Sequence, residues 1–189
     1  MQLLRINSIV LHTRIYGPGW RTAVWFQGCT LACEGCWNKE LWPAKGAEMR
    51  HYKEVLAELM SASRSEGVTF LGGEPLQQAE ALLPLLQDLK ANGKSIFLYS
   101  GYERKELDET QQACVALADI VVLGRYIEAE RDTNLRWRGS RNQVVEFQSD
   151  RYGESDKNGE ASEYEVHIKN DGTSLILGYP PEDVRSLFT

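Results

Sequence analysis

Apolar residues in the first part of the chain recur at two different spacings. Short runs rich in β-branched and aromatic residues predict strands at 3–11, 22–27, 68–71, 95–99 and 119–123. Apolar residues three and four positions apart predict helices at 49–66, 77–91 and 104–117. Because these strands alternate with helices, the chain is predicted to form an α/β fold with a parallel sheet. Ligands of such sheets bind at the carboxyl ends of the strands.

The pattern changes after Arg138. A strand is predicted at 142–147. Beyond it the sequence predicts a polar mobile loop at 148–163. A β-hairpin around Asn170-Asp171-Gly172 is predicted at 164–177, and a short closing helix at 181–188. We therefore expect a core over 1–147 and a C-terminal part over 148–189, whose loop, hairpin and short helix pack on that core.

Length and charge limit the possible functions. The 189 residues suit one domain with a sizeable core. Lysine and arginine total 21 against 27 aspartate and glutamate, a net charge of −6, which argues against nucleic-acid binding over the whole surface. The chain has no apolar run long enough to cross a membrane and no secretory signal pattern at its N-terminus. The sequence predicts a cytoplasmic protein that binds neither nucleic acid nor membrane.

Three of the four cysteines lie close together. Cys29, Cys33 and Cys36 fall within eight residues, whereas Cys114 stands alone on an apolar helix face and is expected to be a small buried residue. Clustered thiols in a reducing compartment indicate a metal site, and thiolates select zinc, copper(I) or iron-sulfur clusters. A structural zinc site needs four ligands, and only three are local. A four-iron cluster on three cysteines would leave one iron open and reactive.

Four motifs each follow directly after a predicted strand. They are the cysteine cluster, Gly72-Gly73-Glu74-Pro75, Tyr99-Ser100-Gly101 and Gly124-Arg125. Since parallel strands end at one edge of their sheet, we expect these motifs to form a single site assembled from four loops.

The spacing Cys29-x3-Cys33-x2-Cys36 resembles the signature of the radical S-adenosylmethionine (radical SAM) superfamily, and Gly72-Gly73-Glu74-Pro75 resembles its second motif. This resemblance implies a partial (incomplete) TIM-type barrel that binds a 4Fe-4S cluster and SAM. The three cysteines would be the metal ligands and the catalytic residues, because the open iron would chelate SAM, whose one-electron cleavage gives a 5′-deoxyadenosyl radical. That radical would abstract hydrogen from the substrate. The candidate cofactor contacts are Trp37, Gly72, Gly73, Glu74, Pro75, Ser100 and Arg125, with Glu74 holding the SAM amino group.

Further motifs resemble one branch of this superfamily. Gly35 stands where the general pattern has an aromatic residue, and Cys36-Trp37-Asn38 resembles the 4Fe-4S single cluster activases of anaerobic ribonucleotide reductase. Other segments that share this resemblance are Gly17-Pro18-Gly19-Trp20-Arg21, Tyr99-Ser100-Gly101-Tyr102 and 135–143. It covers roughly residues 10–147 and implies hydrogen abstraction from a glycine of a large polypeptide partner, with an electron donor such as flavodoxin.

Two alternatives stay open. Compact chains with Gly-Cys-Trp-Asn motifs also resemble enzymes that mature ribosomally made precursor peptides, including spliceases that excise tyramine beside a small leader-binding partner protein. Both enzyme readings abstract hydrogen from a polypeptide. The alternative from another class is a non-catalytic metal-binding interaction module, with zinc on the three cysteines and the C-terminal hairpin as a docking element.

Overall fold

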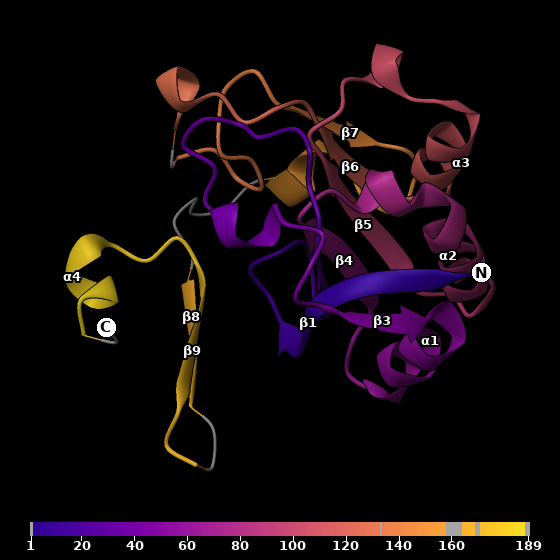
Figure 1. The fold of residues 1–189 in the computed structure, drawn as a ribbon, viewed down its shortest axis with the longest axis horizontal. Coiled ribbons are helices and arrows are strands. Elements are labelled where there is room, and N and C mark those ends of the chain that lie inside the picture. The colour runs from indigo at the N-terminus through magenta and orange to yellow at the C-terminus, as the bar shows by residue number, and fades with distance from the viewer. Residues whose placement is uncertain (1, 133, 158–163, 169–170, 188–189) are drawn as a thin grey trace.

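The computed structural model describes residues 2–132, 134–157, 164–168 and 171–187 (Figure 1). Within these residues, one sheet has the strand order β3-β1-β2-β4-β5-β6-β7, and β8 and β9 form a separate hairpin. The strands are β1 (Leu3–Thr13), β2 (Arg21–Phe26), β3 (Glu48–His51), β4 (Gly67–Gly72), β5 (Ser95–Ser100), β6 (Ile120–Leu123), β7 (Val144–Phe147), β8 (Tyr164–Ile168) and β9 (Ser174–Gly178). The α-helices are α1 (Tyr52–Ser61), α2 (Ala79–Ala91), α3 (Glu109–Leu117) and α4 (Glu182–Arg185). Short 3-10 turns are η1 (Lys39–Leu41), η2 (Pro75–Gln78), η3 (Arg104–Glu106), η4 (Glu128–Glu130) and η5 (Glu154–Lys157).

The centre of the sheet is parallel, as the alternation of strands and helices predicts. Strands β2, β4, β5 and β6 are parallel neighbours. β1 pairs antiparallel with β2, β7 pairs antiparallel with β6, and the edge strand β3 pairs antiparallel with β1. The edge strands β3 and β7 do not pair with each other, so the sheet formed by the described residues is open. The predicted α/β class is confirmed as a mixed fold with a parallel-rich sheet.

One predicted helix begins too early and ends too late. The sequence predicts a helix over 49–66, but its first residues belong to β3, which pairs with β1, and α1 ends at Ser61. His51 has an extended backbone, and its Nδ1 accepts a hydrogen bond from the Lys53 N–H at 3.3 Å, which caps the helix. Gly67, the residue after the predicted range, begins β4.

The predicted helix 104–117 is likewise interrupted. It consists of η3 and α3, because Asp108 has an extended backbone and starts a new helix. The Asp108 carboxylate accepts a hydrogen bond from the Gln111 N–H at 2.8 Å, and the Gln111 side chain accepts one from the Asp108 N–H at 3.0 Å. This reciprocal cap sets the start of α3.

The two faces of the sheet pack against different parts of the chain. Figure 1 shows α1, α2 and α3 together on one side of the strands. Leu98 and Val121 pack toward these helices in the main core. Because strand residues alternate in direction, Phe97 and Val122 point to the opposite face, where they pack with Trp137. The helices therefore leave this second face to loops.

A buried arginine joins the amino ends of three strands. Arg21 is the first residue of β2 and is only 1% exposed. Its Nε donates to Thr69 Oγ1 at 2.7 Å, Nη2 donates to the Val68 carbonyl at 2.9 Å, and Nη1 donates to Ser95 Oγ at 2.8 Å. These contacts connect β2 with β4 and β5 at the end of the sheet opposite the predicted site.

The C-terminal part contains the predicted hairpin. Strands β8 and β9 pair antiparallel, and α4 lies inside the predicted helix at 181–188. Figure 1 shows the hairpin extending away from the main sheet. Of the loop predicted at 148–163, residues 154–157 form η5, and 158–163 lie outside the described residues. Among the helices that the structure describes, none is long and apolar enough to span a membrane.

Candidate functional site

The cysteine loop begins where β2 ends, and backbone hydrogen bonds fasten its first residues. The Gly28 N–H donates to the Leu41 carbonyl at 2.8 Å, and the Cys29 N–H donates to the Trp42 carbonyl at 3.0 Å. The three predicted ligand cysteines are half-buried free thiols that line one cavity, whereas Cys114 is fully buried elsewhere. Cys114 packs in the main core, as predicted, and burial raises its pKa to about 12.

Backbone N–H groups face the thiols of this loop. Burial raises the pKa of the Cys29 and Cys33 thiols. The N–H groups of Leu31 and Ala32 oppose this effect at Cys29, and the Tyr126 N–H opposes it at Cys33, because each donates toward the sulfur. Such donors stabilise thiolates and tune metal-bound sulfur.

Gly35 lies against an acidic side chain. Its φ of +72° is left-handed, and a Cβ at this position would lie 2.0 Å from Glu128 Oε2. That carboxylate also accepts a hydrogen bond from the Tyr126 hydroxyl at 2.5 Å. The left-handed backbone explains why glycine stands there, and the exposed Glu128 side chain would have to move to admit a larger residue.

The Gly72-Gly73-Glu74-Pro75 turn packs directly on the start of the cysteine loop. A Cβ on Gly72 would lie 2.6 Å from the Phe26 nitrogen, and one on Gly73 would lie 2.4 Å from the Gly28 carbonyl oxygen. The Gly73 N–H donates to the Phe26 carbonyl at 2.8 Å, and the Glu74 N–H donates to the Gly28 carbonyl at 2.9 Å. Both glycines are thus needed for the close approach of these two loops.

Glu74 connects this turn to the end of β5. Its Oε1 accepts hydrogen bonds from the Leu76 N–H and the Ser100 hydroxyl, both at 2.9 Å, and its Oε2 accepts one from the Gly101 N–H at 2.8 Å. The residue is 1% exposed, and burial raises its pKa to about 7 despite these donors. The structure therefore brings Glu74 and Ser100, two predicted cofactor contacts, into direct contact.

The remaining predicted contacts divide between the cavity and its surroundings. Trp37, Gly72 and Gly73 line the cavity, whereas Pro75 and Arg125 are not among the residues that line it. Pro75 is buried in η2, and Arg125 forms an ion pair with Glu106 at 2.6 Å. The charge of Arg125 still opposes the rise that burial causes in the pKa of Cys33.

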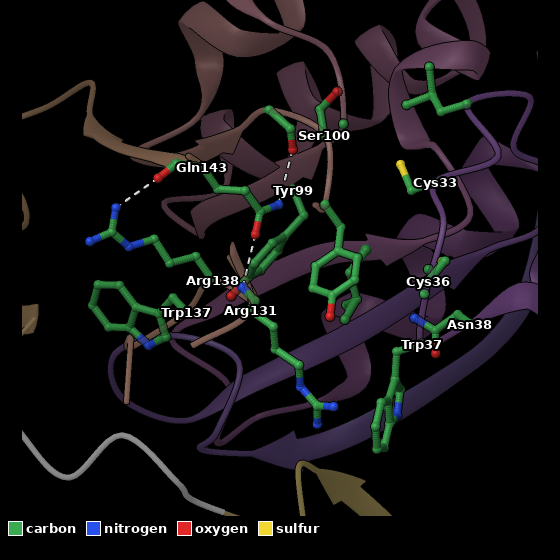
Figure 2. A pocket seen from close by; sticks show the side chains of 18 of the residues that line it. Cys33, Cys36, Trp37, Asn38, Tyr99, Ser100, Arg131, Trp137, Arg138 and Gln143 are labelled. Carbon is green, nitrogen blue, oxygen red and sulfur yellow. Dashed lines mark hydrogen bonds between the residues drawn. The ribbon is translucent and has the colours of Figure 1, made fainter. Parts of the chain in front are cut away.

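All four predicted motifs converge on one cavity of about 400 Å³, a size in the range of ligand pockets. Figure 2 shows Cys33, Cys36 and Trp37 on one side and Trp137, Arg138 and Gln143 on the other. The second wall is held by Gln143, whose Oε1 accepts a hydrogen bond from the Gly139 N–H at 2.8 Å and whose Nε2 donates to the Gly124 carbonyl at 3.0 Å. Gln143 is the last residue of 135–143, one of the segments that share the family resemblance.

Sequence reasoning missed two tyrosines of this cavity, Tyr16 and Tyr179. Tyr16 precedes β2, and its ring packs edge-on against Trp25 at 5.1 Å. Tyr179 follows β9 and reaches the cavity from the C-terminal part of the chain. No local motif marks Tyr179, because a contact between residues so far apart in sequence depends on the tertiary fold.

The donor set fits an iron-sulfur cluster. The cavity contains three soft thiols from one short loop, with N–H groups directed at two of them. No three His, Cys, Asp or Glu side chains of the described residues converge as ligands of a single ion. A cubane cluster takes one thiolate on each of three irons, so its ligands need not meet at one point.

Comparison with known proteins identifies the family. The 4Fe-4S single cluster domain model matches residues 15–146. The anaerobic ribonucleoside-triphosphate reductase-activating protein of Vibrio cholerae is 35% identical over 140 residues, which cover 69% of this chain and 90% of that protein. Its counterpart in Haemophilus influenzae is 33% identical over 139 residues, with the same coverage. Among solved structures, QueE from Escherichia coli covers 52% of each chain with 23% identity and a TM-score of 0.45.

The family match contains the cysteine loop, the Gly-Gly-Glu-Pro turn and the strand ends that form the cavity. The predicted resemblance to the 4Fe-4S single cluster activases of anaerobic ribonucleotide reductase is therefore confirmed. The chain belongs to the 4Fe-4S single cluster domain family and is a relative of the anaerobic ribonucleoside-triphosphate reductase-activating proteins.

Proposed function

We propose that this protein is a radical SAM activating enzyme that generates a glycyl radical on an anaerobic ribonucleotide reductase. The observation that carries this proposal is the coincidence of three thiols, the Gly-Gly-Glu-Pro turn and the strand ends in one cavity, within a chain related to reductase-activating proteins. When bound, a 4Fe-4S cluster with SAM supplies a 5′-deoxyadenosyl radical that takes a hydrogen atom from the polypeptide.

The residues of the chain have distinct parts in this proposal. Cys29, Cys33 and Cys36 would hold the cluster, and Trp37 lines the same cavity. Glu74 remains able to bind an ammonium group, because an ionised carboxylate has about four acceptor positions and its Oε2 accepts only one hydrogen bond, from Gly101, in the described residues. This arrangement supports the assignment of the SAM amino group to Glu74.

The remaining predicted contacts act at the edge of the cavity. Ser100 orients Glu74 through its hydroxyl, and the small Gly72 and Gly73 keep the turn close to the cysteine loop. Pro75 begins η2 and fixes the turn behind Glu74. Arg125 acts through its charge on Cys33 rather than by lining the cavity.

We further propose that the open sheet is a partial TIM-type barrel over 1–147, with its unclosed side as the entrance for a polypeptide. The edge strands β3 and β7 are far apart in the strand order, which supports this architecture. A polypeptide partner and an electron donor such as flavodoxin complete the proposed system.

The test is reconstitution of the full chain with iron and sulfide under anaerobic conditions, followed by incubation with SAM, dithionite and the anaerobic reductase of its host. The expected results are 5′-deoxyadenosine and a glycyl radical detected by electron paramagnetic resonance. A precursor peptide that co-purifies and is modified, with no radical on the reductase, would favour peptide maturation instead. A colourless protein that retains zinc rather than iron would favour the interaction module.

The cluster ligands are tested by iron content. Cys33→Ala is expected to abolish cluster binding, because one of three iron ligands is lost, whereas Cys114→Ala serves as the matched control and keeps the cluster. Normal iron content in Cys33→Ala would contradict the assignment of the cysteine loop.

The role of Glu74 is tested by SAM affinity. Glu74→Ala is expected to weaken SAM binding while the cluster survives. Because alanine leaves the Leu76 and Gly101 N–H groups without their acceptor, Glu74→Gln is the second variant, which removes the charge but keeps an oxygen. Unchanged SAM affinity in both variants, measured by equilibrium dialysis, would remove Glu74 from this role.

A further inference from the structure

A segment outside the family match forms part of the cavity. The family model ends at residue 146, yet Gly178 and Tyr179 line the same cavity as the three cysteines. The Gly178 N–H donates to the Tyr16 hydroxyl at 2.9 Å, and Leu177 beside it is buried, with 4% exposure. The Arg14 N–H donates to Glu165 at 2.8 Å, which fastens β8 to the segment before β2. The hairpin is thus attached to the core at both strands.

Tyr179 lies against the cysteine loop. Its ring packs edge-on against Trp37 at 5.1 Å between centroids, and the Arg131 guanidinium lies 5.9 Å from the Trp37 ring. Trp37 directly follows Cys36 in the chain, and Cys36, Trp37 and Tyr179 line the same cavity. The residue is nevertheless 46% exposed, so the ring lies at the boundary between cavity and solvent.

The attachment of the hairpin does not need the Tyr179 hydroxyl. Tyr16, Leu177 and the contact between Arg14 and Glu165 hold the hairpin in place. Within the described residues, the structure gives the Tyr179 hydroxyl no hydrogen-bond partner. A partly exposed ring with an available hydroxyl at a cavity mouth is suited to a peptide, because it offers both an apolar face and a polar group.

We propose that Tyr179 is a positioning residue, supplied by the C-terminal hairpin, that forms the cavity wall on the Cys36 side and packs against the polypeptide segment that enters. The identity of the molecule that enters the cavity rests on the proposed function. The Tyr179 ring suits an extended polypeptide with an apolar side chain beside the reacting residue. The hairpin thereby adds a specificity contact to a site whose thiols come from the core.

The wall itself is tested without turnover. In the cluster-free full chain, iodoacetamide alkylation of Cys36 and Cys29 is followed by mass spectrometry, with Cys29 as the internal reference. Tyr179→Ala is expected to raise the ratio of the Cys36 rate to the Cys29 rate severalfold, whereas Tyr179→Phe leaves it unchanged. Tyr164→Ala is the matched control, because Tyr164 lies on the same hairpin with a similar exposure of 40% but does not line this cavity. An unchanged ratio in Tyr179→Ala would overturn the proposal.

Positioning is tested by kinetics of the loaded enzyme on the reductase. Loss of the ring contact is expected to raise KM for the polypeptide by about tenfold in Tyr179→Ala, with kcat and iron content close to wild type. Tyr179→Phe should recover most of this loss. A lower kcat in proportion to lower iron content would show a structural effect and overturn the proposal. If no variant or wild-type protein forms a glycyl radical, the proposed function fails, and the alkylation ratio still decides whether Tyr179 forms the wall.

Discussion

Replacing Arg21 by lysine is expected to destabilise the protein more than replacing it by methionine. The Arg21 guanidinium is buried and donates to neutral oxygens on two strands, at Thr69 and Val68 of β4 and at Ser95 of β5. A buried charge without good hydrogen bonds is more costly than an apolar side chain of similar size. The conservative exchange is therefore the more damaging one at this position.

The magnitude follows from the hydrogen bonds of Arg21. Lysine keeps the charge but places all its N–H donors on one atom, so it cannot reach both strands as the planar guanidinium does. Loss of two hydrogen bonds from a charged group costs about 3 to 6 kcal/mol. Methionine carries no charge and recovers the desolvation cost. Of the three carbonyls that Arg21 contacts, it leaves that of Val68, at 2.9 Å, without its short hydrogen bond, at about 1 to 3 kcal/mol, while those of Ser95 and Pro18 lose weaker contacts at 3.3 and 3.4 Å.

The assay is urea denaturation of the cluster-free full chain under reducing conditions. Because burial lowers the pKa of a lysine ammonium, the Arg21→Lys chain binds more protons when unfolded, and its stability should rise between about pH 7 and about pH 9 relative to wild type. Arg104→Lys is the control, since the Arg104 side chain is 50% exposed and pairs with Glu146, and it should cost less than about 1 kcal/mol. An Arg21→Lys chain within about 1 kcal/mol of wild type, or more stable than Arg21→Met, would refute the reasoning.

Two further predictions concern the cysteine loop and the sheet. Gly35→Ala should lower iron content after reconstitution, because its left-handed backbone disfavours a side chain by roughly 1 to 2 kcal/mol and the added Cβ would meet the Glu128 carboxylate; full iron content would contradict this. Asp119→Asn should lower the free energy of unfolding by about 2 kcal/mol at neutral pH, as measured by urea denaturation. Burial raises the pKa of Asp119, but the hydrogen bonds that it accepts from Lys90, Ser149 and the Ile96 N–H lower the pKa by more than burial raises it. The folded pKa is thus below the unfolded value of 3.8, so the wild-type advantage should persist above that pH and disappear as pH falls through the folded pKa; an advantage that is unchanged in acid would contradict the assignment.

The sequence predicted the parts of the fold that depend on short-range patterns. The parallel strands β4, β5 and β6 follow apolar runs bounded by turn residues, and the cysteine spacing indicated the chemistry of the site. The strand β3 was missed because its four residues read equally well as the first turn of a helix. Its pairing with β1 is a contact between distant segments, which periodicity does not reveal.

The residues of the candidate site that directly follow parallel strands could be predicted from the sequence, whereas those from distant segments of the chain could not. The rule that parallel strands end at one edge brought the cysteines, Glu74 and Ser100 together, and the structure confirms that they share one cavity. The same rule included Arg125, whose side chain instead pairs with Glu106. Residue position after a strand indicates proximity to a site, but local ion pairs decide the direction of a long side chain.

The core loops and the C-terminal hairpin, which together form the cavity, should respond differently to substitution. The thiols and the Gly-Gly-Glu-Pro turn are fixed by close backbone approaches, in which even a Cβ on Gly73 would meet the Gly28 carbonyl. Tyr179 follows a hairpin that is attached to the core through hydrogen bonds that involve the Tyr16 and Glu165 side chains. Substitutions at Tyr179 can therefore alter the shape of the cavity mouth without moving the cluster ligands. On this argument the core determines the chemistry and the hairpin modifies which polypeptide is accepted, so exchange of the hairpin should change partner preference before it changes iron binding.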